Sequence, residues 1–188
     1  MKIGIDISQI AYEGTGVARY LRSLVEELLR IDKKNEYVLF FSSLRRKIPS
    51  FAKAASFAEV ATKAESAGKR NSKIKAFRFP PSLLDLLWNR LHILPVEWLI
   101  GDVDIFITSD WTEPPVLRAK KATILYDLIV YKYPQETDKH IVEVQKRKLE
   151  WAKKESDLIF CISEATKKDA MEILDVEEER LKVILPGV

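Results

Sequence analysis

Short, continuous runs of apolar residues alternate with amphipathic segments along this chain of 188 residues. Such runs are typical of parallel strands, which are covered on both faces, whereas a strand with one solvated face alternates apolar and polar residues. Strands that alternate with helices build parallel sheets, because each parallel pair needs a crossover connection. The sequence therefore predicts an α/β fold with a doubly wound, mostly parallel, Rossmann-like sheet.

The chain has the length of one ordinary domain, so we expect residues 1–188 to form a single Rossmann-like unit. The clearest helix follows Gly16, where apolar residues recur at the spacing i, i+3, i+4, i+7. The expected helices are residues 17–29, 82–91, 135–155 and 163–174. The expected strands are residues 2–6, 37–41, 74–79, 104–108, 122–126, 157–162 and 182–185.

The charge is distributed unevenly. The formal net charge is +3, yet residues 42–80 contain ten basic and only two acidic residues. Within this basic segment, apolar residues from Ile48 to Ala58 lie at helical spacing. The interpretation we favour is a solvated loop with a short helix. The alternative is a basic amphipathic helix that lies on an anionic membrane surface. We expect no nucleic acid partner, because no known reading motif accompanies the charge.

Composition limits the other classes of site. The single cysteine, Cys161, can form no internal disulfide, and two histidines make a structural zinc site improbable. We therefore expect no metal and no cofactor. Neither a secretory signal nor a membrane span is evident. The expected location is the cytoplasm, with peripheral attachment to the inner face of the membrane if the basic segment binds lipid.

The loop after the first expected strand is the first candidate site, because doubly wound sheets bind ligands beyond the carboxyl ends of their strands. It contains Gly14, Thr15 and Gly16 and opens a helix whose first amides, near Val17, can donate to an anion or a sugar hydroxyl. A dinucleotide fingerprint would need a third glycine where Arg19 stands, and no P-loop motif is present. The alternative is a turn that only joins strand to helix.

Polar residues also follow the later strands. Asp110 comes after the strand at 104–108, and Tyr126 and Asp127 end the strand at 122–126. A carboxylate at this edge can orient sugar hydroxyls by accepting paired hydrogen bonds. Ser163 follows the strand at 157–162. Asp127 and Ser163 each have an alternative interpretation as residues that cap a loop or a helix.

Several segments resemble, in order, parts of the retaining glycosyltransferases of family four, which have the two-domain GT-B architecture. Together they cover nearly the whole chain except the basic segment. The family usually has a histidine where Tyr126 stands. The matching segments are residues 16–20 (GVARY), 88–91 (WNRL), 94–95 (LP), 104–106 (DIF), 124–129 (ILYDLI), 133–134 (YP), 156–163 (SDLIFCIS) and 180–188 (RLKVILPGV).

The resemblance implies an amino-terminal, acceptor-binding domain that acts in polysaccharide or glycolipid biosynthesis. The enzyme would move a sugar from a nucleotide-sugar donor to a hydroxyl of a sugar or a lipid-linked acceptor, with retention. A carboxyl-terminal domain, absent from this chain and supplied in cis or in trans, would hold most of the donor, so the isolated chain is expected to be inactive. Asp127 and Tyr126 would then be catalytic, and the substrate-binding residues would be Gly14, Thr15, Gly16, Val17, Arg19, Asp110 and Ser163.

Two other functions remain open from the sequence. One is a free-standing doubly wound module with a binding or regulatory role, which would need no second domain. The other is an adaptor at a membrane surface that acts through the basic segment at 42–80.

Overall fold

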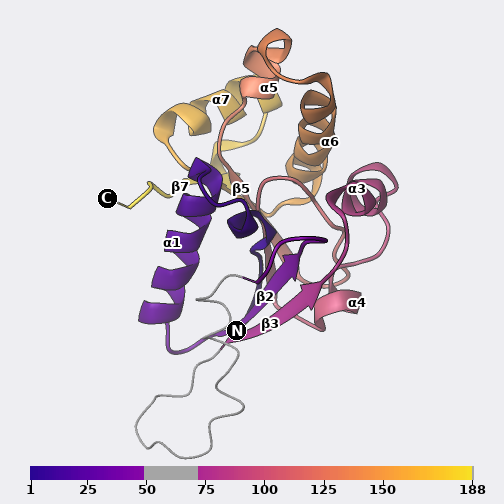
Figure 1. Cartoon of the computed structure of the whole chain (residues 1–188). Helices are drawn as coiled ribbons and strands as arrows, with labels where there is room; N and C mark the ends of the chain where they lie inside the picture. The colour runs from indigo at the N-terminus through magenta and orange to yellow at the C-terminus, as the bar shows by residue number, and fades with distance from the viewer. Residues whose placement is uncertain (49–71, 188) are drawn as a thin grey trace, which may run out of the picture.

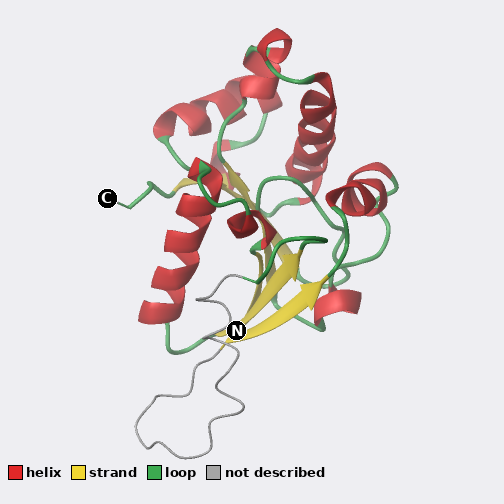
Figure 2. Ribbon diagram, viewed as in Figure 1, coloured by secondary structure: helices red, strands yellow, loops and turns green. Residues whose placement is uncertain are grey.

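The computed structural model describes residues 1–48 and 72–187. Within them the chain forms one sheet of seven parallel strands in the order β3-β2-β1-β4-β5-β6-β7, with helices packed against it (Figures 1 and 2). This confirms the predicted doubly wound α/β fold. The strands are β1 (Lys2–Asp6), β2 (Glu36–Ser42), β3 (Ser72–Phe77), β4 (Ile105–Thr108), β5 (Lys120–Leu125), β6 (Leu158–Cys161) and β7 (Leu181–Val183).

The helices agree with the sequence where the amphipathic pattern is long. The expected helix at 82–91 is instead one α-helical turn followed by a π-helix, and the expected amphipathic segment at 48–58 lies almost wholly outside the described residues. The α-helices are α1 (Gly16–Ile31), α3 (Pro81–Leu84), α4 (Glu97–Ile100), α5 (Ile129–Lys132), α6 (Lys139–Glu155) and α7 (Glu164–Leu174). The π-helix is η3 (Asp85–Arg90), and the 3-10 turns are η1 (Ser8–Ala11), η4 (Pro134–Glu136) and η5 (Glu178–Arg180).

The two faces of the sheet carry different helices, because successive side chains of a strand point to opposite faces. Ile5 and Leu39 pack with Leu21 of α1 in one apolar cluster. On the other face, Phe40 and Trp88 belong to a cluster beneath α3, η3 and α4. A further cluster on this second face lies beneath α6 and α7 and includes Leu149, Cys161 and Ala170.

Glycine is needed at one position in the central strand. A Cβ atom at Gly4 would lie 2.7 Å from Cδ2 of Phe106 and 3.0 Å from Cδ1 of Ile100. The strands β1 and β4 are in register here, with Gly4 opposite Phe106. The missing side chain therefore makes room for the aromatic ring on the face covered by α4.

The chain reverses its direction of winding between β1 and β4. After β1 it moves outward to β2 and β3, and it then returns to β4 on the other side of β1 before it continues to β7. In open parallel sheets, the loops separate at such a switch point and leave a crevice at the carboxyl ends of the strands. The loops after β1, β4 and β5 converge on this edge.

Candidate functional site

A cavity of about 220 Å³ lies at the carboxyl end of β5, between α1 and α6. Its apolar lining includes Ile124, Val130 and Leu149, and Val17 contributes from the first turn of α1. Polar groups enter from the loops after β4 and β5 and from α6. These residues are Asp110, Trp111, Tyr126, Asp127, Gln145 and Lys148.

Asp110 and Gln145 form the polar pair of this cavity. Nε2 of Gln145 donates to Oδ1 of Asp110 at 3.2 Å. Burial raises the pKa of the Asp110 carboxyl above its ordinary value, although the charge of Lys148 and the bond from Gln145 act against the rise. A carboxyl group in this setting can accept hydrogen bonds from ligand hydroxyls and, when protonated, can donate one.

Lys148 is held by a buried polar network. Its Nζ atom donates to Oγ1 of Thr123 at 2.6 Å and lies 3.5 Å from Oε2 of Glu113. Oε2 of Glu113 also accepts a hydrogen bond from Thr108 at 2.7 Å, and the Glu113 side chain is fully buried. Burial lowers the pKa of the Lys148 ammonium below its ordinary value, while the carboxylates of Glu113 and Asp110 oppose this shift.

The network continues away from the cavity. Nζ of Lys121 lies 3.5 Å from Oε1 of Glu113 and 2.8 Å from Oε2 of Glu155. Nε2 of His92 lies 2.9 Å from Oε1 of Glu155, and the His92 ring stacks on Trp151 with centroids 3.5 Å apart. The position of Lys148 at the cavity thus depends on contacts that extend through the layer between the sheet and α6.

Tyr126 lines the cavity from a buried position. Its hydroxyl lies 3.1 Å from Oγ of Ser109, and its ring meets Tyr20 of α1 edge-to-face at a centroid distance of 5.7 Å. Burial raises the pKa of the Tyr126 phenol well above its ordinary value. A phenol that stays protonated can donate or accept a hydrogen bond, but it cannot serve as the readily protonated base that a histidine would supply at this position.

Asp127 and Ser163 both have the local role that the sequence left open as an alternative. Oδ1 of Asp127 accepts from the amide of Ile129 at 3.0 Å, and the residue is exposed at the rim of the cavity. Oγ of Ser163 accepts from the amide of Thr166 at 3.0 Å and caps α7. Asp127 keeps a second carboxylate oxygen for a ligand, whereas Ser163 does not line this cavity.

Asp6 ends the central strand β1 and is buried beside the same edge of the sheet. Its Oδ1 accepts from the amide of Ser8 at 2.9 Å. Burial raises the pKa of the Asp6 carboxyl from 3.8 to about 6, with a smaller contribution in the same direction from the charge of Glu113. The hydrogen bonds from Ser8 oppose the rise but do not cancel it.

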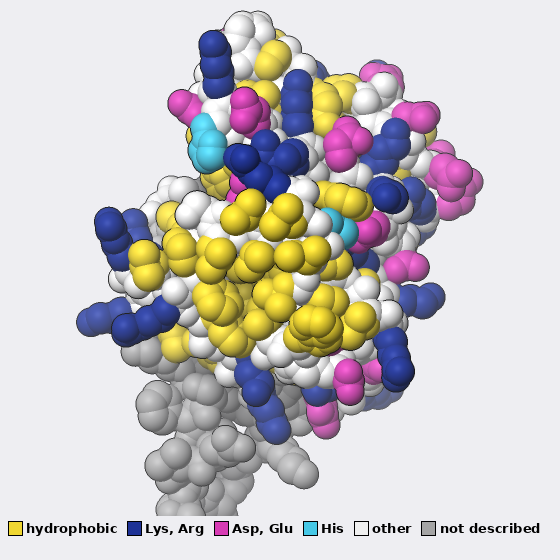
Figure 3. Space-filling view, turned by 90° about the vertical axis from the view of Figure 1, so that its right-hand side faces the viewer, with side chains coloured by type: hydrophobic (Ala, Val, Ile, Leu, Met, Phe, Trp, Pro, Cys, Tyr) yellow, Lys and Arg dark blue, Asp and Glu magenta, His cyan; other side chains and the backbone are white. Residues whose placement is uncertain are grey.

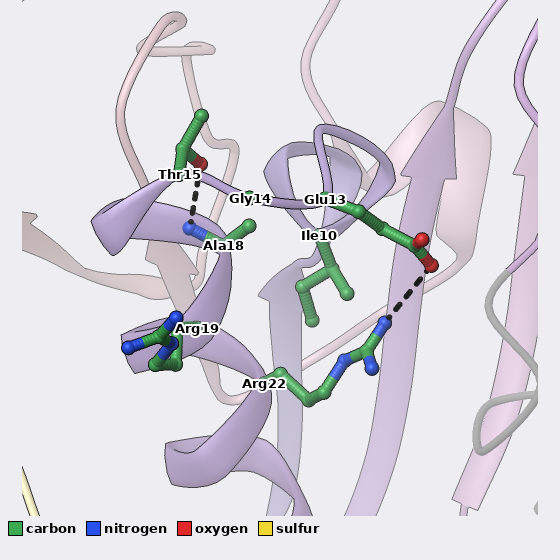
Figure 4. Close-up of a pocket in the computed structure, with 7 residues that line it drawn as sticks. All are labelled: Ile10, Glu13, Gly14, Thr15, Ala18, Arg19 and Arg22. Atoms are coloured by element: carbon green, nitrogen blue, oxygen red, sulfur yellow. Dashed lines mark hydrogen bonds and ion pairs between the residues drawn. The ribbon is translucent and has the colours of Figure 1, made fainter.

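The glycine loop lines a second cavity, also of about 220 Å³, shown in Figure 4. Gly14 has a φ of +95°, a region that favours glycine, and Oγ1 of Thr15 accepts from the amide of Ala18 at 3.1 Å. Arg22 of α1 pairs with Glu13 at 3.4 Å, while Arg19 extends from the next face of the helix (Figure 4). Gly16 is the first residue of α1.

The structure brings together some of the residues expected from the sequence and separates others. Val17, Asp110, Tyr126 and Asp127 line one cavity, and Gly14, Thr15 and Arg19 line the other. Sequence reasoning missed Gln145 and Lys148. The signal for Lys148 was present, because a lysine stands four residues after Val144 and four before Ala152 on the buried stripe of α6.

Within residues 1–48 and 72–187, no group of three or more histidine, cysteine, aspartate or glutamate side chains could hold a metal ion. Among the same residues, no helix is both long and apolar enough to cross a membrane. No known family model matches the chain, and no curated protein matches it with significance.

Proposed function

We propose that this chain is the acceptor-side half of a retaining glycosyltransferase of the GT-B type. It would help to transfer a sugar from a nucleotide-sugar donor to the hydroxyl of a sugar or lipid-linked acceptor. The observation that carries the proposal is the cavity at the carboxyl end of β5, which combines two carboxyl groups, an amide, an ammonium and an indole. The ordered set of segments that resemble family-four enzymes supports the same conclusion.

A sugar suits this combination of groups chemically. Vicinal hydroxyls present closely spaced donors and acceptors, which Asp110, Asp127 and Gln145 can pair with at the rim of the cavity. The indole of Trp111 and the side chain of Val17 offer apolar surface for the C–H groups of the ring. Ligand pockets commonly combine an apolar lining with a few placed polar groups of this kind.

The glycine loop would serve the anionic part of the donor. At the start of α1 the amides of Ala18 and Arg19 already donate to Thr15, which leaves those of Gly16 and Val17 to donate to an anion. The positive end of the helix dipole adds to this attraction. Arg19 lines the cavity at this helix end. A second domain would supply further cations for the diphosphate leaving group and would close over both substrates, which excludes water from the reaction.

Sugar binding can be tested by ligand-observed saturation-transfer NMR with a panel of monosaccharides and nucleotide sugars. We expect saturation of sugar ring protons by the wild-type chain and its loss in Gln145→Ala. The matched control is Gln135→Ala, because Gln135 is exposed and does not line the cavity. Absence of binding by every sugar, or equal binding by both variants, would remove the support for the proposal.

A turnover measurement tests whether sugar transfer needs a second domain. The isolated chain, supplied with nucleotide sugars and a mixture of hydroxyl acceptors, should release nucleotide far more slowly than the ~1–1,000 s⁻¹ of ordinary enzymes. Release at an ordinary rate would show that no second domain is needed. Restoration of transfer by a separately added carboxyl-terminal domain would support the proposal.

A further inference from the structure

Exposed apolar side chains gather on the side of the molecule where α3, η3 and α4 lie, opposite the carboxyl terminus of the chain (Figures 1 and 3). Trp98 is 68% exposed and Leu91 54% exposed. Soluble monomers rarely expose a large contiguous apolar patch without a function for it. We define the apolar face by its most exposed members, which are Leu86, Leu91, Ile93, Trp98 and Leu117.

The local structure holds these side chains outward. Trp88, the buried neighbour of the face, is 0% exposed, and its Nε1 donates to the carbonyl of Leu94 at 2.9 Å. His92 and Leu94 both have positive φ angles, of 51° and 67°. The exposed Ile93 lies between them, so the backbone itself sets its position. A positive φ is uncommon for leucine and indicates a turn that the surrounding contacts enforce.

The turn that carries Leu117 is held against α4 by the buried side chain of Glu97. Oε1 of Glu97 accepts hydrogen bonds from the amides of Leu117, Arg118 and Ala119, at 2.8, 3.2 and 3.3 Å. The turn that carries Leu117 is therefore fixed directly beside the helix that carries Trp98. The apolar face is a structured surface built from two chain segments.

Cations border the apolar face. Lys73 and Lys75 are exposed on β3 and lie in register with Val38 and Phe40, whose side chains belong to the cluster beneath α3 and α4. Residues in register on neighbouring strands point to the same face of the sheet, so both lysines project toward the side of the apolar face. Arg118 adds exposed positive charge from the turn after Leu117, whereas Arg90 of η3 is paired with Asp85, with Nε 3.1 Å from Oδ2.

Acidic residues are present beside this face but fewer. Glu97 is the only acidic residue between positions 86 and 101, and it is buried, whereas Asp102 and Asp104 follow directly and are exposed. The exposed cations Lys73, Lys75 and Arg118 outnumber these two acids, so the small excess of positive charge favours an anionic partner. A surface with exposed tryptophan and leucine side chains and a basic border is typical of proteins that lie on an anionic bilayer.

We propose that the apolar face docks onto an anionic lipid bilayer, with Trp98, Leu91 and Ile93 inserted among the acyl chains and Lys73 and Lys75 placed near the headgroups. This inference goes beyond the proposed sugar transfer and does not depend on it. A second copy of the chain is the other occupant that an apolar face could take, and the light-scattering measurement below detects it.

Co-sedimentation with lipid vesicles tests the proposal on the full chain. We expect binding to vesicles of phosphatidylcholine with phosphatidylglycerol and little binding to phosphatidylcholine alone. Lys73→Gln combined with Lys75→Gln should weaken binding roughly 25-fold, since each cation near the surface contributes about fivefold. The matched charge control is Lys168→Gln combined with Lys182→Gln, which removes two exposed lysines of α7 and β7 and should have a much smaller effect.

A second pair of variants tests the contribution of the apolar side chains to vesicle binding. Trp98→Ser should abolish most vesicle binding and also the blue shift of tryptophan fluorescence that insertion produces. Ile31→Ser, at a position 62% exposed at the end of α1, should leave both unchanged. Unchanged binding by Trp98→Ser would place lipid contact elsewhere and overturn the proposal. So would a dimer, detected by light scattering without lipid, that Trp98→Ser dissociates.

Discussion

The substitution Asp6→Asn should stabilise the protein at neutral pH. The folded state raises the pKa of this carboxyl from 3.8 to about 6, chiefly by burial. A group whose pKa is higher in the folded state favours folding below its unfolded pKa and loses that contribution as the pH rises through its folded pKa. The shift of about two units corresponds to ~3 kcal/mol, at about 1.4 kcal/mol per unit.

Urea unfolding at a series of pH values measures this effect. Asparagine keeps an oxygen that can accept the hydrogen bond from the amide of Ser8, but it carries no charge. The variant and the wild type should therefore have similar free energies of unfolding near pH 4. Between about pH 4 and 6 the difference should grow, and above about pH 7 it should reach up to ~3 kcal/mol in favour of Asp6→Asn.

The matched control is Asp102→Asn, because Asp102 is exposed beyond α4. It should change the free energy of unfolding by less than about 0.5 kcal/mol at every pH. A constant difference between Asp6→Asn and the wild type from about pH 4 to pH 8 would refute the reasoning, because no protonation would then be linked to folding at this position.

Two further substitutions test the interior. Glu113→Gln should lower the free energy of unfolding by about 3–5 kcal/mol, because it leaves the buried ammonium of Lys148 without its nearest buried carboxylate. Urea unfolding measures this change, and a loss below about 1 kcal/mol would contradict the prediction. Gly4→Ala should cost about 1–3 kcal/mol because the new Cβ meets the ring of Phe106 at 2.7 Å. Thermal unfolding of Gly4→Ala with and without Phe106→Leu checks this, because the smaller side chain should recover part of the loss.

The strands and long helices were predictable because their patterns are local. A continuous apolar run such as residues 37–41 fits a strand that is buried on both faces, and it lies within β2. The short helices α4 and α5 have only four residues each, too few for a recognisable period. The π-helix η3 depends on contacts distant in sequence, such as the bond from Nε1 of Trp151 to the carbonyl of Asn89 at 2.9 Å.

The candidate site was predictable only where residues follow strand ends. Asp110, Tyr126 and Asp127 could be placed at the carboxyl edge from the strand pattern alone. Lys148 could not, since its role depends on Thr123 and Glu113, which lie 25 and 35 positions earlier in the chain. A lysine on the apolar stripe of a helix signals a buried charge but does not identify its partner.

The central place of β1 in the sheet has a consequence for synthesis on the ribosome. This strand is translated before both of its partners, yet it pairs with β4, which begins at Ile105, as well as with β2, which ends at Ser42. At about 5–20 residues per second, roughly 3–13 seconds pass between the translation of these two partners. During that interval one side of β1 offers unpaired backbone groups to other nascent chains, so a chaperone that shields this edge should raise the yield of native protein.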